Sequence, residues 1–455
     1  MTKKNQILSE VFDHGQKIVE TVYKIEERET FLAVFEGGEG NVKESVPGFR
    51  DEEYFALPPE TDFIKSELLK LPSSIIPYEG PIELYQRIKD FIAEYSQLDD
   101  EFIVVSSVYV MMTWVYDRFR TVPYLRVIGL PGTGKSRYLE VLANISYKGL
   151  YCGGSTSTSA MFRLVDATRG TLVFDEADFS RSDPSSDIAK ILNGGHSKGG
   201  VATRSEKKGR DGNFTPRSFS VFGPKIFATR GRFADAALES RCITRSLFPL
   251  PKSNRPIHLP IDFENKALNL RNQLLSFRGD CFTKTLEDPK TVEGLDNPRL
   301  AQISLALTSV AKMIGSDVCQ QVVEFLKTYE AVVSDEQGPI EESDVLVCVG
   351  ELLSEPEIEK SKKLHMETIA RYYNETKSED RDSNYPKDKL TGKKVGQVAG
   401  GLNLRKKRDG RGFYLPLDDG QLRTINLLLQ RFGLSEVVKK VEKTEKIEED
   451  DEIEF

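Results

Sequence analysis

The stretch Gly129-Leu-Pro-Gly-Thr-Gly-Lys-Ser136 fits the phosphate-loop pattern GxxxxGK(S/T) at every fixed position. A β-rich run, 124–128, precedes it, and a helical pattern with apolar Tyr138, Leu139 and Leu142 follows it. In this context of strand, loop and helix, glycines let backbone N–H groups surround phosphate oxygens. An ordinary glycine-rich turn between a strand and a helix is the alternative.

The residues of this loop have distinct expected roles. Lys135 would reach the β- and γ-phosphates of ATP, and the Ser136 hydroxyl would ligate Mg²⁺. ATP and Mg²⁺ are therefore the expected cofactors. The residues expected to line the nucleotide are Gly129, Pro131, Gly132, Thr133, Gly134, Lys135, Ser136 and Arg137.

A second element, Thr171-Leu-Val-Phe-Asp175-Glu176, is an apolar run that ends in two acids. We expect Asp175 to hold Mg²⁺ through its water shell, and Glu176 to polarise the attacking water as general base. The alternative is that both acids cap the helix that follows them.

Composition narrows the class of protein. A chain of 455 residues with 39% hydrophobic and 29% charged residues is typical of a globular protein of about three domains, and not of a collagen-like or disordered one. The net charge is −8, but the last twenty residues hold nine acids against four lysines, so acidity elsewhere is slight. The net charge therefore does not exclude nucleic acid as a partner.

Five cysteines without a CxxC pair predict neither a disulfide framework nor a zinc site. The most apolar stretch, 102–116, is shorter than the roughly 20 residues that cross a bilayer, so we expect a buried helix and no membrane contact. The N-terminus lacks the apolar core of a signal peptide. We expect a cytoplasmic protein whose 16 Tyr and 25 Phe lie mainly in the core and do not stack on bases.

The alternation of short β-rich runs with helical segments predicts an α/β fold with a parallel sheet. We expect a leader of unknown role at 1–75, with a helix near 7–25 and a strand at 31–35. A P-loop domain with preceding helices is expected at 76–262, and a helical region at 263–338. A further domain is expected at 339–434, and a disordered acidic tail at 435–455.

Two basic segments are candidates for binding nucleic acid. The first, 194–222, has β-like flanks around a glycine-containing tip, which predicts a hairpin. The second surrounds Asp409-Gly410, a strong hairpin-turn signal, and follows a glycine-interrupted helix at 391–402. Such side chains contact phosphates without reading sequence, although charged loops are often only solvated. The candidates are Lys198, Arg204, Lys207, Lys208 and Arg210, and then Arg405, Lys406, Lys407, Arg408 and Arg411.

With these motifs in place, the chain resembles AAA+ ATPases, and in particular the minichromosome-maintenance (MCM)-like helicases of phages, plasmids and other mobile elements. The resemblance is strong over 120–335 and moderate over 340–434. It implies a helical lid at 263–338 and a winged-helix domain at 339–434, whose wing is the second basic hairpin.

The resemblance also implies roles for three residues. Arg241, in Asp235-Ala-Ala-Leu-Glu-Ser-Arg241, resembles the arginine finger that completes a neighbouring subunit's site. Thr229 stands where the family has its sensor-1 residue, more often Asn, and Arg299 resembles the sensor-2 arginine. A surface arginine and a salt-bridged helix-end arginine are the respective alternatives for Arg241 and Arg299. His196 lies between glycines, either at the hydrolysis site or in a structural role.

The implied function is a ring-forming, ATP-hydrolysing DNA helicase or translocase that replicates a mobile element. The ring of identical subunits is expected to be a hexamer acting on single-stranded or forked DNA, with a replication or mobile-element protein as a further partner. An AAA+ loader, remodeller or defence ATPase that acts on nucleoprotein without unwinding is the alternative. A nucleotide-regulated DNA-binding protein is a third.

Overall fold

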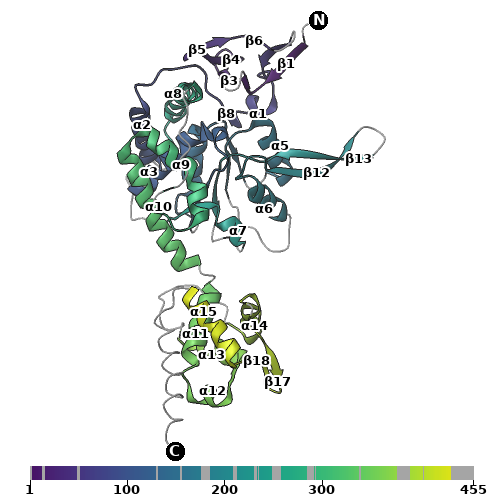
Figure 1. Ribbon diagram of the computed structural model, residues 1–455. Coiled ribbons are helices and arrows are strands. Elements are labelled where there is room, and N and C mark those ends of the chain that lie inside the picture. Colours follow the sequence, from purple (N-terminus) through teal and green to yellow (C-terminus); the bar gives the residue numbers. More distant parts are fainter. Residues whose placement is uncertain are drawn as a thin grey trace, which may run out of the picture. The chain divides into compact units, whose positions relative to one another are not determined.

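The computed structural model describes most of the chain, and Figure 1 presents it as a ribbon. It divides into two compact units, residues 1–330 and 331–455, which we describe separately. The described residues are 3–12, 16–48, 52–129, 132–153, 156–175, 185–208, 213–229, 233, 235–247, 258–283, 292, 294–337, 340–376, 390–402 and 404–431.

The first unit is built on a six-stranded sheet in the order β15-β9-β14-β11-β10-β8. Neighbouring strands pair in parallel, except that β8 runs antiparallel to β10. The predicted parallel α/β sheet is therefore confirmed. Its strands are β8 (Leu69–Lys70), β9 (Tyr124–Ile128), β10 (Gly149–Cys152), β11 (Leu172–Phe174), β14 (Lys225–Thr229) and β15 (Cys242–Ser246).

The register of this sheet gathers some candidate residues at one edge and places others at the opposite edge. Ile128 pairs with Thr229, and Phe174 pairs with Phe227, so the carboxyl ends of β9, β14 and β11 lie together. Arg241, in contrast, comes just before β15, and its carbonyl accepts a hydrogen bond of 2.9 Å from the amide of Tyr124, the first residue of β9.

Helices pack around the sheet, as Figure 1 shows. The predicted apolar segment forms a helix, α3, whose residues from Phe102 to Thr113 are all buried, and Asp99 caps it by accepting from the amide of Phe102. None of the described helices is both long and apolar enough to cross a membrane. The helices are α1 (Asp62–Lys65), α2 (Pro81–Tyr95), α3 (Asp100–Thr113), α4 (Lys135–Ile145), α5 (Thr158–Thr168), α6 (Ser185–Gly194), α7 (Ala236–Glu239), α8 (Phe263–Thr283), α9 (Pro298–Ile314) and α10 (Ser316–Gln337), the last of which runs across the boundary between the units.

The second unit combines helices with a three-stranded antiparallel sheet in the order β16-β18-β17. The predicted helix at 391–402 and the predicted hairpin after it are both present, as α14 and β17-β18. The tail predicted to be disordered, 435–455, lies outside the described residues. The elements are α11 (Ile340–Leu352), α12 (Pro356–Ser361), β16 (Lys363–His365), α13 (Met366–Thr376), α14 (Gly392–Gly401), β17 (Lys407–Asp409), β18 (Gly412–Pro416) and α15 (Asp419–Arg431).

The N-terminal region corrects one prediction. The helix expected near 7–25 is wrong, because this region forms strands, whereas the strand expected at 31–35 lies within β4 and is confirmed. The segment from Ile18 to Val22 is buried on both faces of its strand, which removes the alternation that reveals a strand in sequence. The strands form sheets β2-β3-β4-β5 and β1-β7-β6. They are β1 (Lys3–Ile7), β2 (Ser9–Phe12), β3 (Lys17–Lys24), β4 (Glu29–Glu36), β5 (Glu39–Lys43), β6 (Ser45–Pro47) and β7 (Glu52–Ala56).

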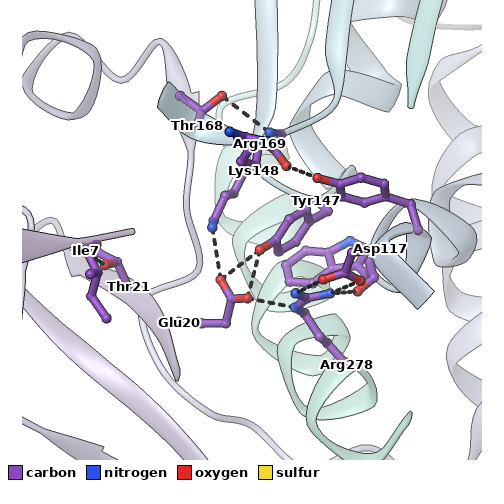
Figure 2. A network of polar contacts seen from close by, with 12 residues as sticks. Ile7, Glu20, Thr21, Asp117, Tyr147, Lys148, Thr168, Arg169 and Arg278 are labelled. Atoms are coloured by element: carbon purple, nitrogen blue, oxygen red, sulfur yellow. Dashed lines mark hydrogen bonds and ion pairs between the residues drawn. The ribbon is translucent and has the colours of Figure 1, made fainter. Parts of the chain in front are cut away.

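A buried carboxylate connects this N-terminal region to the central sheet (Figure 2). Glu20 on β3 is 1% exposed and accepts hydrogen bonds from the Tyr147 hydroxyl at 2.8 Å and from Arg278 Nε at 2.7 Å. Lys148 Nζ lies 3.1 Å from the same carboxylate. Arg278, on α8, also pairs with Asp117 at 2.7 Å. Because buried charges are costly unless paired, this network fixes β3, the start of β10 and α8 against one another.

Replacing Glu20 by Gln should cost about 3–5 kcal/mol of unfolding free energy, because Lys148 would remain buried without its carboxylate. Chemical denaturation can follow the fluorescence of Trp114, the chain's single tryptophan, whose carbonyl accepts a 2.6 Å hydrogen bond from Arg278. Glu27→Gln is the control, because its pair with Lys24 is exposed and should be worth less than about 1 kcal/mol. Equal losses in the two variants would contradict this account.

Candidate functional site

The phosphate loop lies between β9 and α4, where its glycines are conformationally required. Gly132 and Gly134 have φ of +84° and +88°, a region that side chains with a β-carbon rarely adopt. A β-carbon on Gly129 would lie 2.8 Å from the carbonyl oxygen of Leu247, so the backbone passes too close for any larger residue. Pro131, predicted to line the nucleotide, lies outside the described residues.

The polar side chains of the loop meet the end of β11. Lys135 Nζ donates to the carbonyl of Gly129 at 2.5 Å, so the ammonium group folds back over the loop. The Ser136 hydroxyl donates a hydrogen bond to the Asp175 carboxylate. The structure thus brings together the two residues that were predicted to hold the metal. Glu176, the predicted general base, lies outside the described residues.

The fit of this pair to Mg²⁺ can be judged from its donors. A hydroxyl and a carboxylate are the hard oxygen ligands that Mg²⁺ takes alongside waters and substrate phosphates. Within the described part of the chain, no three His, Cys, Asp or Glu side chains gather into a group that could hold a metal by itself. Ser136 and Asp175 therefore fit a Mg²⁺ ion that is shared with a nucleotide.

Thr229 supplies a further polar group at this edge of the sheet. It ends β14, the strand between β9 and β11, and its carbonyl accepts a 3.4 Å hydrogen bond from the amide of Gly129. The residue is 2% exposed, and its buried hydroxyl has no hydrogen-bond partner among the described residues. A buried polar atom without a partner costs about 1–3 kcal/mol, so a polar ligand beside the phosphate loop would stabilise the hydroxyl.

Arg241 and Arg299 lie together, away from the phosphate loop. Arg241 Nε is 3.1 Å from Nδ1 of His196, and Arg299 Nη2 is 2.9 Å from its Nε2. Arg241 also donates to the Asn193 side chain at 2.9 Å and to the carbonyl of Ala237, and Arg299 donates to Gln302 at 2.6 Å. The hydrogen bonds of both guanidinium groups within the described chain thus go to neutral acceptors.

The two acids nearest to Arg241 in sequence form hydrogen bonds or ion pairs with other residues. Glu239 on α7 pairs with Arg126 of β9, which is fully buried, and Asp235 accepts a 3.0 Å hydrogen bond from Asn193. The buried pair of Arg126 and Glu239 anchors α7, the helix that immediately precedes Arg241. This pair therefore fixes the position of Arg241. The hydrogen bond from Asn193 and the charge of Arg241 both lower the pKa of Asp235, so Arg241 also interacts with the charge of that carboxylate.

His196 cannot serve both arginines at once. A neutral imidazole has one N–H and one acceptor nitrogen, yet an arginine N–H faces each of its nitrogens. The ring is 8% exposed, and burial together with Arg241 and Arg299 lowers the pKa of His196 to about 4. His196 therefore stays neutral at pH 7. Because it has a single acceptor nitrogen, it can accept a hydrogen bond from only one of the two guanidinium groups at a time.

The position of this arginine pair separates it from the chain's own phosphate loop. Arg241 lies at the amino end of β9 and the loop at its carboxyl end, so about 13 Å of strand separates them. His196 lies at the amino end as well, because its carbonyl accepts from the amide of Val122 at 2.9 Å. Through its contact with His196, Arg299 belongs to this end too.

The first predicted basic hairpin is present and projects from the first unit (Figure 1). Strands β12 (Val201–Lys208) and β13 (Asn213–Ser220) pair from Val201 with Ser220 to Lys208 with Asn213. Arg210 lies outside the described residues, as do the side chains of Lys207 and Lys208. Lys198 precedes β12 and donates to the carbonyl of Asp117 at 3.0 Å.

Arginines gather around two neighbouring aromatic rings at the root of this hairpin. Phe162 on α5 and Phe219 on β13 have ring centroids 5.0 Å apart. The guanidinium groups of Arg204 and Arg217, which pair across the strands, lie 5.3 Å from the Phe162 ring and 4.7 Å from the Phe219 ring. Arg163 lies 5.4 Å from the Phe162 ring. Arg163 and Arg217 were not predicted, since only the register and the packing of α5 reveal them.

The second basic group surrounds the β17-β18 hairpin. Arg405 pairs with Asp418, Lys406 donates to the carbonyl of Gly396 at 2.6 Å, and the Arg408 guanidinium group lies 5.5 Å from the ring of Phe413. Lys407, on β17, and Arg411, in the turn, are exposed. All five predicted side chains therefore lie in or beside this hairpin.

Comparisons with known proteins find structural likeness only. No protein-family model and no curated protein matches the chain. The chain is similar to the apo C-terminal region of NrS-1 in two structures. In one, identity is 10% and the TM-score 0.36, over 88% of this chain and 96% of that one. In the other, identity is 9% and the TM-score 0.34, over 87% and 96%.

The chain is also similar to Cch of SCCmec type IV, described as an active helicase. The identity is 11% and the TM-score 0.38, over 90% of this chain and 94% of that chain.

The neutral state of His196 predicts a pH dependence of stability. As the pH falls from 6.5 to 4, the unfolded chain binds a proton at this residue before the folded chain does, so stability falls with a slope of up to about 1.4 kcal/mol per pH unit. His196→Gln should remove this contribution, as measured by denaturation at intervals across that range. His258→Gln, at an exposed histidine, is the control. An unchanged slope in His196→Gln would refute the assignment.

Proposed function

We propose that this chain is an ATP-hydrolysing AAA+ motor that forms a ring and moves along or unwinds DNA. We further propose that it belongs to the MCM-like type of phages, plasmids and other mobile elements. The observation that carries the proposal is the separation of two halves of one catalytic site. The phosphate loop, Asp175 and Thr229 lie at one end of the parallel strands, and Arg241 and Arg299 lie at the other.

The first half would bind and orient the nucleotide. The loop amides and Lys135 would hold the phosphates, and Ser136 and Asp175 would hold Mg²⁺, which would supply positive charge against the phosphates when bound. The unpartnered hydroxyl of Thr229 would hydrogen-bond to the γ-phosphate or to the attacking water. Glu176, which directly follows Asp175, would accept the proton of that water.

The second half would complete the site of a neighbouring subunit. Two guanidinium groups without carboxylate hydrogen-bond partners in the described chain form a strong site for an anion. His196 can accept a hydrogen bond from only one of the two arginines. The oxygens of a γ-phosphate presented by another subunit would accept hydrogen bonds from both Arg241 and Arg299. Charge that develops on the phosphate oxygens during hydrolysis would be stabilised by Arg241, as an arginine finger, and by Arg299.

The basic hairpins would hold the nucleic acid. The β12-β13 hairpin follows α6 and leads directly into β14, the strand that ends in Thr229, so it connects a DNA contact to the nucleotide site. In the second unit, α11, α13 and α14 with the β16-β18-β17 sheet support a winged-helix domain whose wing is the β17-β18 hairpin. Contacts with phosphates would suit a motor that must release and grip any sequence.

A subunit-mixing experiment tests the shared site. Lys135→Ala and Arg241→Ala should each reduce steady-state ATP hydrolysis, the latter by about 10³-fold or more. Mixed in equal amounts, they should regain activity, because about a quarter of the interfaces in a head-to-tail ring would join an intact phosphate loop to an intact arginine. Arg87→Ala, at an exposed ion pair of α2, should match the wild type.

The absence of any rescue in the mixture would refute a site shared between subunits. Wild-type hydrolysis that single-stranded DNA does not stimulate would refute the DNA motor. DNA-stimulated hydrolysis without displacement of a strand from forked DNA would instead favour a loader or remodeller of nucleoprotein.

Arg163→Ala combined with Arg217→Ala should remove DNA stimulation and leave basal hydrolysis intact, because both exposed guanidinium groups lie at the hairpin root, away from the nucleotide. Each lost phosphate contact should reduce the slope of log affinity against log salt by about 0.7 for single strands. Arg169→Ala, which removes a pair with Asp166 next to α5, is the control. An unchanged salt slope would exclude these arginines from the DNA contact.

A further inference from the structure

A cavity in the second unit lies between the first half of α14 and the β17-β18 hairpin. Its volume is about 420 Å³, within the range of small-ligand sites. Gly396 of α14, the aromatic ring of Phe413, and both cationic and acidic side chains line it. All of its lining residues belong to the second unit and lie within the part of the chain that the structure describes.

The charge of the lining indicates the chemistry of a ligand. Lys393, Lys406 and Arg411 contribute three cations, against the single carboxylate of Glu367. The cations come from α14, from the residue before β17 and from the hairpin turn, so the fold brings them together from separate elements. Lys406 is held in place by its 2.6 Å hydrogen bond to the carbonyl of Gly396. This balance favours an anionic ligand such as a phosphodiester.

The wall of the cavity adds an aromatic surface. Phe413 is 54% exposed, which departs from the expectation that phenylalanines lie in the core. An exposed ring beside several cations is the combination that binds single-stranded nucleic acids, in which bases stack on rings and phosphates meet basic side chains.

The shape of the cavity favours a single strand over a duplex. Gly392, Gly396 and Gly400 are spaced by four residues and share one face of α14, and the first two line the cavity. A helix that reads a major groove needs side chains that protrude toward base edges, and glycines provide none. At Gly396 a β-carbon would meet no atom within 4 Å, whereas at Gly392 it would meet Glu367, so the open space beside the helix is at Gly396. This space and the ring of Phe413 line the same cavity, which leaves room for one unstacked base.

We propose that this cavity binds a nucleotide unit of single-stranded nucleic acid, with its base at Phe413 and its phosphates at Lys393, Lys406 and Arg411. The proposal rests on the proposed nucleic-acid function and gives the second unit a role different from duplex contact. DNA and RNA strands share this chemistry, and the test separates them.

The test uses the full-length chain with Phe413→Trp as a local reporter, without ATP. The chain's own tryptophan, Trp114, is 1% exposed and should give a constant background. Oligodeoxyuridylate or oligouridylate of about a dozen nucleotides should quench the added fluorescence by stacking. These two strands carry the same base, so the one that quenches more strongly reveals the sugar preference. A duplex of equal length should quench at least tenfold more weakly.

A second substitution blocks the cavity without harming the fold. A β-carbon on Gly396 meets no atom within 4 Å, so Gly396→Leu should fill the cavity, and it replaces a helical glycine by a better helix former, which favours α14 by up to about 1 kcal/mol. It should weaken quenching by at least about tenfold, or 1.4 kcal/mol. Gly410→Leu is the matched control. A β-carbon at Gly410 also meets open space, but Gly410 does not line the cavity.

Absent quenching, equal quenching by the duplex, or quenching that survives Gly396→Leu would overturn the proposal. Because the measurement needs no hydrolysis, its outcome is independent of the ATPase assays. DNA-stimulated hydrolysis without quenching would refute the cavity alone, and quenching without hydrolysis would refute the motor alone.

Discussion

The parallel pairing of β9 with β14 and β15 determines where the phosphate loop, Thr229 and Arg241 lie. Parallel strands bring all their carboxyl ends to one edge, so the phosphate loop, Thr229 and Asp175 meet there, although they are far apart in sequence. The same pairing sends Arg241 to the opposite edge. One topological constraint therefore brings the loop, Thr229 and Asp175 together and keeps Arg241 away from them. Under the proposed function, it assembles half of a hydrolytic site and leaves the other half to a neighbouring subunit.

Buried charges hold this arrangement in place. Arg126 lies in the middle of β9 and pairs with Glu239, which fixes the helix before Arg241. Glu20 and Arg278 do the same between the N-terminal strands and α8. Such pairs contribute little net stability compared with apolar packing, but removing one partner is costly. They are best understood as positioning devices, since each one lies where a segment must keep a defined place relative to the sheet.

The features predicted correctly from sequence are local ones. The loop at Gly129–Ser136, the strands beside it and the turn at Gly410 each depend on residues that are adjacent in the chain. The strand around Val19 was missed because burial on both faces hides its period. The arginine pair could not be foreseen as a pair, because Arg241 and Arg299 meet at His196 across 45 and 103 residues of sequence. The exposure of Phe413 likewise depends on which face of a hairpin is covered, and sequence does not encode that locally.

The opposite placement of loop and arginine has a consequence for symmetry. In the proposed ring, each contact joins the loop edge of one copy to the arginine edge of the next, so every copy uses two different surfaces and the contact is heterologous. An open row of such copies always ends in one loop without an arginine and one arginine without a loop. Only closure gives every subunit a complete site, so under the proposed mechanism the specific activity per subunit would report directly on whether the assembly is closed.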